Sequence, residues 1–323
     1  MKPAETKSAQ PHDKLFRHCM LLPKVARQFL EAWLPKGFLA LVDWSTLSVQ
    51  RISGMDESLK ERREDVIYRI KASGRPVHFY ILLEHQTRPE RRMALRCLEY
   101  SLGVWRAEAQ TKPLPLVIPI VVHPGPGAWK SPRRLRELIE VPAEIAPWAE
   151  EFIPDSGYLI AELAGHPMEQ LASGSLGRAV MAALQAERLG KMSYRQVKKI
   201  VETLYADGNS PEATRLARQL WVYLLEHSEL KDPQIREIVE TTVPKRNQSN
   251  FMSTAQRLKL EGRQEGRQEG RQEAIIKLLK IRHKRVPAGL LEAVADVSDE
   301  RHLERLFLAA AQSATLEKFS ESL

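Results

Sequence analysis

The sequence is poor in cysteine, which occurs only twice in 323 residues, as Cys19 and Cys97. The two cysteines stand far apart and in no paired motif, so the sequence predicts neither a disulfide framework nor a cysteine-based zinc site. We expect both thiols to be buried and outside any disulfide. Such cysteine usage fits a reducing compartment.

Long hydrophobic runs are also missing. The longest apolar stretch, residues 114–122, is interrupted by prolines and is far too short to span a bilayer. Residues 1–11 are polar and lack the apolar core of a signal peptide. We therefore expect a soluble, cytoplasmic protein that has no membrane partner.

The motifs of several enzyme classes are absent. The sequence has no glycine-rich phosphate loop, no Gly-x-Ser-x-Gly nucleophile motif and no paired-histidine metal motif. It also shows no recognition helix or zinc finger that would read DNA bases. The enzyme classes that these motifs define therefore find no support here.

Positive charge, in contrast, is in excess, with a formal net charge of +8. A basic excess attracts polyanions, and nucleic acid is the commonest of them. The alternative is a soluble protein that is basic without such a partner.

Hydrophobic residues make up 43% of the chain, which is enough for a buried core. The length suits one catalytic domain and a second module.

The pattern of apolar residues predicts a compact α/β domain with a mixed sheet, because a helix, strands, a helix and a strand follow one another. The predicted elements are helices from Asp13 and over residues 25–33 and 93–109, and strands over residues 65–70, 77–86 and 116–122. Residues 39–52 suggest strand or loop. The helix over residues 93–109 is expected to carry its apolar side on Leu95, Leu98, Leu102 and Trp105.

Beyond about residue 165 the strand signals fade and helical patterns follow. We predict helices over residues 176–189, 194–205, 211–227 and 233–239. The sequence therefore suggests an α/β domain at residues 12–165, an all-α module at residues 166–250, and a repeat helix with a helical tail at residues 251–323.

A four-residue repeat of Glu, Gly, Arg and Gln begins at Glu261 and ends near Ala274. In a helix, the glycines would form a seam without side chains, because a period of four nearly matches 3.6 residues per turn. Each glycine costs about 1 kcal/mol relative to alanine, so such a helix is weak alone. Self-association along this seam, giving a homo-oligomer, and a flexible charged linker are both open interpretations.

The two predicted strands around residues 73–76 place polar side chains together. If these four residues form the loop, Ala72 faces Val77, and Asp65 lies directly opposite Glu84. Gln86 projects from the same face because side chains alternate along a strand, and His85 projects from the other.

Two carboxylates held this close repel each other, and a divalent cation is one reason to keep them together. Magnesium binds carboxylates and completes its octahedron with waters and phosphate oxygens, and a metal so placed assists attack on a phosphate. Gln86 would hydrogen-bond a water or a phosphate oxygen. The alternative is that Asp65 and Glu84 lie at strand ends in water, and a one-residue error in the turn would change the register.

These residues resemble a known nuclease pattern. Asp65 on one strand and Glu84-His85-Gln86 at the end of the next are similar to the PD-(D/E)XK nuclease core, with glutamine in the usual lysine position. The wider sequence resembles the Rpn family of recombination-promoting nucleases, which are also labelled YhgA-like transposases. The resemblance runs from about His12 to Ala274. It is carried by Phe16-Arg17-His18, by residues 59–68, 82–86 and 116–125, and by the late Glu-Gly-Arg repeats.

The resemblance implies a restriction-endonuclease-like fold, a mixed sheet flanked by helices, and magnesium-dependent DNA cleavage linked to recombination. It implies metal ligands at Asp65 and Glu84, a further ligand at the backbone carbonyl of His85, and Gln86 in place of the lysine. Asp13 is the candidate for an acidic residue on the first helix that assists in such nucleases. Manganese is an alternative metal.

Two basic clusters fit a DNA partner, because phosphate contacts give affinity without sequence choice. The first consists of Arg88, Arg91, Arg92 and Arg96, and the second of Lys130, Arg133, Arg134 and Arg136. For each single residue the alternative is a solvated surface charge. His123, near a Pro-Gly breaker, is expected to be a turn histidine.

Three functions therefore compete. The first is a metal-dependent DNA endonuclease, and the second is an inactive relative that binds DNA as an accessory protein. The third is an assembly protein whose repeat and helical tail drive oligomerisation. Only the first requires Asp65 and Glu84 to hold a metal, and the third predicts no affinity for nucleic acid at low salt.

Overall fold

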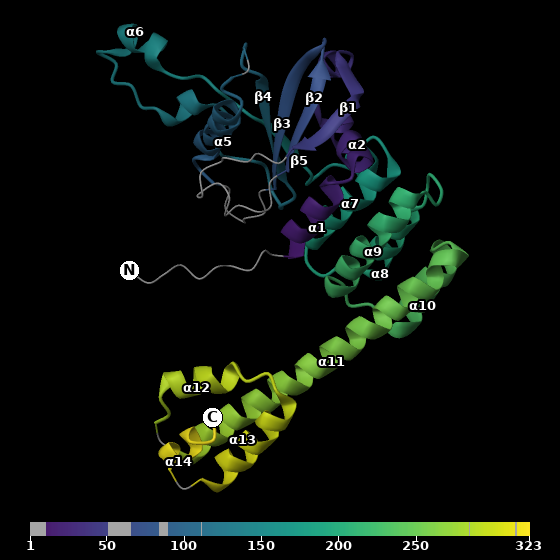
Figure 1. The fold of residues 1–323 in the computed structure, drawn as a ribbon, viewed down its shortest axis with the longest axis vertical. Coiled ribbons are helices and arrows are strands. Elements are labelled where there is room, and N and C mark those ends of the chain that lie inside the picture. Colours follow the sequence, from purple (N-terminus) through teal and green to yellow (C-terminus); the bar gives the residue numbers. More distant parts are fainter. Residues whose placement is uncertain (1–10, 51–65, 84–89, 111, 284, 314) are drawn as a thin grey trace. The chain divides into compact units, whose positions relative to one another are not determined.

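The computed structural model describes residues 11–50, 66–83, 90–110, 112–283, 285–313 and 315–323. The chain divides into two compact units, Met1–Phe251 and Met252–Leu323 (Figure 1). Among the described residues, no helix combines the length and apolar character that crossing a bilayer would require.

The first unit contains a five-stranded mixed sheet with the strand order β1-β2-β3-β4-β5. The strands are β1 (Val42–Gln50), β2 (Val66–Ala72), β3 (Arg75–Leu83), β4 (Leu116–His123) and β5 (Leu159–Glu162). Strands β1, β2 and β3 pair antiparallel, whereas β3, β4 and β5 pair parallel. One edge of the sheet therefore holds the start of β2 and the carboxyl ends of β3, β4 and β5. The predicted α/β class with a mixed sheet is confirmed.

The turn between β2 and β3 is shorter than predicted. Ala72 pairs with Arg75, and Val66 pairs with Ile81. The turn is therefore two residues long, and the predicted pairing of Ala72 with Val77 is wrong by two positions. Ser73 and Gly74 both have positive φ angles, of 48° and 76°. Two such residues form the turn whose twist matches that of the flanking strands.

Pro76 fits inside β3, although proline cannot donate a backbone hydrogen bond. Its antiparallel partner is Lys71, and the parallel pairing with β4 begins only at the next residue, Val77, which pairs with Leu116. Pro76 therefore lies beyond the end of the β4 ladder, where a missing N–H has no consequence.

Most helices of the first unit occur close to their predicted positions, but two short helices, over residues 36–39 and 146–149, were not predicted. They are α1 (Pro11–Met20), α2 (Pro23–Trp33), α3 (Lys36–Leu39), α5 (Met93–Ala107), α6 (Ala146–Ala149), α7 (Ser175–Glu187), α8 (Tyr194–Leu204), α9 (Pro211–Glu226) and α10 (Asp232–Thr242). Serine caps explain two sharp starts, because Ser193 and Ser210 accept hydrogen bonds from the first turns of α8 and α9. Strand β5 was not predicted, since four residues are too few to show an alternating pattern.

The buried face of α5 differs from the predicted one. Met93, Cys97, Tyr100 and Val104 are buried, and the ring of Tyr100 stacks on Tyr80 of β3 at 4.1 Å. Leu95 and Leu102 are 37% and 38% exposed, whereas Leu98 and Trp105 pack at the margin of the core. The predicted stripe and the buried stripe both have helical spacing, so spacing alone does not distinguish them. The buried stripe contains small side chains and the aromatic ring of Tyr100.

The second unit is helical. It includes α12 (Ala288–Ala295), α13 (Glu300–Gln312) and α14 (Leu316–Ser320), and α11 (Lys245–Arg282) runs through the repeat. Its core consists of Ile275, Leu279, Val294, Leu303, Leu306, Ala310 and Phe319. The end of the repeat contacts the chain between α12 and α13. Gln272 donates to the carbonyls of Ala295 and Val297, and Arg271 forms an ion pair with Glu300 at 3.3 Å.

Candidate active site

The sheet edge that holds the ends of β3, β4 and β5 is the candidate active site. In the chain, Asp65 immediately precedes β2, and residues 84–86 immediately follow β3. Asp65, Glu84, His85, Gln86 and Arg88 lie outside the described residues. What the structure describes is the framework on either side of them: the ends of β2 and β3, the neighbouring strands, and the beginning of α5.

His123 and Glu162 end β4 and β5 at this edge, and they are paired in the parallel ladder. His123 is only 3% exposed, and its ring lies against Trp129 with the ring centres 5.2 Å apart. The expectation of a turn histidine is therefore wrong, because His123 is the last residue of a buried strand. Glu162 carried no sequence signal, since β5 itself was not predicted.

Trp129 joins these two strand ends. Its backbone N–H donates to Glu162 Oε1, and its indole N–H donates to the hydroxyl of Tyr158 at 2.8 Å. The hydroxyl of Tyr158 in turn donates to the carbonyl of Pro132 at 2.9 Å. The carboxyl end of the sheet therefore has a hydrogen-bonded wall of buried aromatic side chains.

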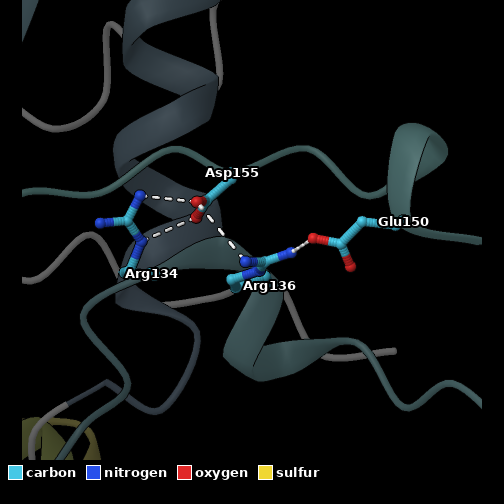
Figure 2. Close-up of polar contacts among 4 residues, drawn as sticks. All are labelled: Arg134, Arg136, Glu150 and Asp155. Carbon is cyan, nitrogen blue, oxygen red and sulfur yellow. Dashed lines mark hydrogen bonds and ion pairs between the residues drawn. The ribbon is translucent and has the colours of Figure 1, made fainter.

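The second basic cluster is largely neutralised within the chain. Arg134 donates two hydrogen bonds to Asp155, at 2.8 and 2.6 Å, and Arg136 contacts both Glu150 and Asp155 (Figure 2). The hydrogen bonds from Arg134 lower the pKa of Asp155. These arginines hold the chain between β4 and β5, so the interpretation of the cluster as a phosphate contact loses support for Arg134 and Arg136.

The first basic cluster follows the candidate site along the chain. Arg91 and Arg92 are exposed just before α5, where the helix N-terminus also favours an anion. Arg96 lies over the ring of Tyr100, with its guanidinium carbon 5.8 Å from the ring centre, and its Nε is 3.3 Å from the hydroxyl. Of the described members, Arg91 and Arg92 are therefore the most exposed.

Asp13 lies in the first turn of α1 and is 3% exposed. Its helix contacts α2, α7 and α9, and the far end of α1 is tied to the sheet because the Tyr68 hydroxyl donates to the carbonyl of Met20. A buried carboxylate near a helix N-terminus is favoured by the helix dipole. Its role beside a metal remains a prediction.

Comparison with known proteins assigns the chain to a family. The model of the family described as "Putative transposase, YhgA-like" matches residues 10–214, which is more than half of the chain. The matched region includes the whole sheet and the helices up to the start of α9. No solved structure matches the chain.

Curated relatives match a shorter region. Recombination-promoting nuclease RpnC of Escherichia coli (strain K12) is 37% identical over 120 residues, which are 36% of this chain and 40% of the relative. Recombination-promoting nuclease RpnD of Escherichia coli O157:H7 is 34% identical over 121 residues, which are 36% of this chain and 46% of the relative.

A third relative carries a different description. The inactive recombination-promoting nuclease-like protein RpnE of Escherichia coli (strain K12) is 30% identical over 123 residues, 38% of this chain and 41% of the relative. The matched regions thus span less than half of each of these relatives. The chain belongs to the family described as "Putative transposase, YhgA-like", and its curated relatives include Rpn recombination-promoting nucleases.

Proposed function

We propose that this protein is a metal-dependent DNA endonuclease that hydrolyses phosphodiester bonds during recombination. The observation that carries the proposal is the position of the motif relative to the strands. Asp65 directly precedes β2 and Glu84 directly follows β3, and the described ends of these two strands lie at one edge of the sheet. The names of RpnC and RpnD support the same activity. Action on cellular DNA would place the protein in the cytoplasm.

In this proposal residues 12–165 form a restriction-endonuclease-like core. The order of elements supports it: helices, the antiparallel strands β1 to β3, the crossover helix α5, and the parallel strand β4. The all-α module at residues 166–250 and the repeat helix and tail at residues 251–323 would then serve in partner or DNA contacts.

The proposed ligands fit magnesium by their chemistry. The carboxylates of Asp65 and Glu84 and the backbone carbonyl of His85 offer oxygen atoms, which magnesium prefers over nitrogen or sulfur. The corrected hairpin register is compatible with Asp65 and Glu84 as ligands of one ion. A shift of two positions preserves which face each side chain occupies, so Asp65 and Glu84 are still expected on the same face. Manganese would substitute for magnesium with the same ligands.

The remaining residues have proposed roles in positioning. Gln86, in place of the lysine, would hydrogen-bond the attacking water or a phosphate oxygen. Asp13 would add a carboxylate from α1. Arg88, Arg91, Arg92 and Arg96 would contact the DNA backbone, with Arg91 and Arg92 the most exposed of the described three.

The decisive experiment measures nicking of supercoiled plasmid with magnesium or manganese. Asp65→Asn and Glu84→Gln should each reduce nicking at least 100-fold, because a metal ligand is lost without a change in side-chain shape. Asp296→Asn and Glu140→Gln are matched controls at exposed positions and should leave nicking unchanged. Equal nicking by all four variants would indicate a contaminating nuclease and sink the proposal.

A second candidate function is DNA binding without cleavage. It is favoured by the similarity to RpnE, whose name describes it as inactive. This candidate predicts that the native protein shifts DNA in a gel at low salt, and that Arg92→Gln weakens the shift, while no metal supports nicking. The native protein therefore distinguishes the two candidates without any variant: the first predicts metal-dependent nicking, and the second predicts a gel shift without nicking.

We further propose that the repeat in α11 associates with a second copy of the chain. A side chain built at Gly270 would meet no atom within 4 Å, so the glycine seam is open to close approach at this position. Arg271 and Gln272, the two residues after Gly270, contact residues 295–300 of the same chain. Deletion of residues 261–273 should lower the mass measured by light scattering, and an unchanged mass would refute association through the repeat.

A further inference from the structure

A cluster of metal-binding side chains lies between three helices of the first unit, outside the candidate active site. His12 of α1, Glu187 at the end of α7 and His227 just after α9 each offer one ligand atom, and these atoms lie within 4.8 Å of one another. Figure 1 shows α1, α7 and α9 packed together, in agreement with their mutual contacts.

The cluster is largely shielded from solvent. The side chains of His12 and Glu187 are 14% and 19% exposed, and His12 Nδ1 lies 3.5 Å from Glu187 Oε2. This distance is too long for the hydrogen bond that a protonated histidine would make, and Glu187 Oε2 is buried with no hydrogen-bond partner among the described residues. A buried carboxylate oxygen without a donor is costly, and a bound cation would satisfy it.

His227 makes one hydrogen bond that is common among metal-binding histidines. Its Nδ1 lies 2.9 Å from the carbonyl of Tyr223, which accepts and cannot donate, so Nδ1 carries the proton. The lone pair is then on Nε2. A hydrogen bond from one ring nitrogen to a backbone carbonyl commonly fixes the tautomer of a histidine that ligates a metal through its other nitrogen.

Tyr223 is a competing partner of His12. Its hydroxyl lies 2.8 Å from His12 Nδ1. Burial and the nearby Glu187 raise the pKa of Tyr223, whereas Arg188 lowers it. In the tautomer of His12 that carries its lone pair on Nδ1, this hydroxyl donates to Nδ1 and competes with a metal ion for it. The guanidinium of Arg188 opposes a cation here, so the site must gain its affinity from direct ligand bonds.

We propose that His12, Glu187 and His227 bind one divalent transition-metal ion of the zinc class. Two imidazole nitrogens and one carboxylate suit zinc, which takes about four ligands at about 2.0–2.2 Å and hence about 3.4 Å from each other. The separation of 3.5 Å between His12 Nδ1 and Glu187 Oε2 is already close to this value. Magnesium, which prefers oxygen ligands, would not compete.

Such an ion would fasten the start of α1 to α7 and α9. Helix α1 contacts both α7 and α9, and His12 directly precedes the buried Asp13. The site would therefore act as a structural clamp on the first turn of α1. This inference stands independently of the proposed nuclease activity.

The test titrates chelator-treated full-length protein with zinc alone in a calorimeter. The Asp65→Asn/Glu84→Gln background removes the proposed magnesium ligands, so zinc bound there is not counted. One zinc ion per chain should bind in this background. His227→Gln and Glu187→Gln should each weaken the affinity at least tenfold, whereas Tyr223→Phe, which removes only the competing donor, should bind zinc at least as tightly.

Matched controls and a second readout complete the test. His18→Gln on α1 and Glu226→Gln on α9 alter exposed neighbours and should leave the affinity unchanged. In the Asp65→Asn/Glu84→Gln background, zinc should raise the Tm by several degrees, and the addition of His227→Gln should abolish this rise. Equal zinc affinity of the background protein with and without His227→Gln or Glu187→Gln, or no binding below millimolar zinc, would overturn the proposal.

Discussion

The glycine two residues after His123 is required by the histidine ring. A Cβ atom at Gly125 would lie 2.9 Å from His123 Cε1, and the ring cannot withdraw easily because it is buried against Trp129. We predict that Gly125→Ala lowers the free energy of unfolding by about 1–3 kcal/mol through overpacking, as measured by urea denaturation.

Gly37→Ala is the matched control for this substitution. A Cβ at Gly37 meets no atom within 4 Å, and the residue lies in α3, where alanine is favoured over glycine by about 0.5–1 kcal/mol. The control should therefore be neutral or stabilising. Equal stability losses at both positions would show that crowding of His123 is not the cause.

His78, in the middle of β3, should make stability depend on pH. Burial lowers the pKa of His78, Glu108 at 3.1 Å raises it, and Arg69 lowers it, with a net decrease from 6.5. The folded state then binds fewer protons than the unfolded chain. The contribution of neutral His78 to the free energy of unfolding is therefore fully present above about pH 6.5. This contribution is lost as the pH falls below that value.

The measurement compares urea midpoints of the native protein and His78→Gln at pH 7.5 and pH 5.5. The midpoint of the native protein should fall more between these two pH values than that of His78→Gln. His18→Gln, an exposed histidine substitution, should keep the pH dependence of the native protein. An identical pH response of His78→Gln and the native protein would contradict the assignment.

At the scale of elements, the β2–β3 hairpin owes its register to Ser73 and Gly74. Both residues adopt left-handed backbone angles, which asparagine tolerates better than serine. We predict that Ser73→Asn raises the free energy of unfolding by about 0.5 kcal/mol, and that Gly74→Ala lowers it by about 1 kcal/mol. Thermal denaturation would test both, and the same sign for both would refute the turn type.

This hairpin also shows how far the sequence could predict the fold. The strands were evident from their runs of β-branched and aromatic residues, but the register depends on turn length, and Ser-Gly followed by Arg-Pro is compatible with two or four turn residues. The buried face of α5 was ambiguous because two stripes have helical spacing. Helices α7 to α10 were predicted closely, since each shows amphipathic spacing and several show a start signal.

The candidate site was only partly predictable for a related reason. Asp65 and Glu84 stand in a motif that resembles a known pattern, so the sequence alone indicates them. The proposed zinc site shows no such signal in the sequence. Its ligands are His12, Glu187 and His227, and more than 170 residues separate the first from the second. Only tertiary packing brings these side chains together.

At the scale of the whole molecule, the two compact units should respond separately to a core substitution. Leu306 is fully buried in the core of the second unit, so Leu306→Ala should destabilise that unit by about 2–5 kcal/mol. All six tryptophans lie in the first unit. Helical circular dichroism should therefore begin to fall at lower temperature in this variant, while the tryptophan fluorescence transition stays at its native temperature.

Leu303→Ala, at a second fully buried position of the same core, should have the same effect on the two signals. Val104→Ala, in the core of the first unit, should shift the fluorescence transition instead. A joint shift of both signals in Leu306→Ala would show that the two units unfold as one.

The burial of the two cysteines makes them chemical reporters of motion in the first unit. Cys19 lies in α1 and Cys97 in α5, at 0% and 2% exposure, and neither forms a disulfide. Burial raises the pKa of Cys19, which suppresses the reactive thiolate. An alkylating reagent therefore reaches each thiol only when its own helix opens, so the two alkylation rates record how often α1 and α5 detach during the life of the native protein.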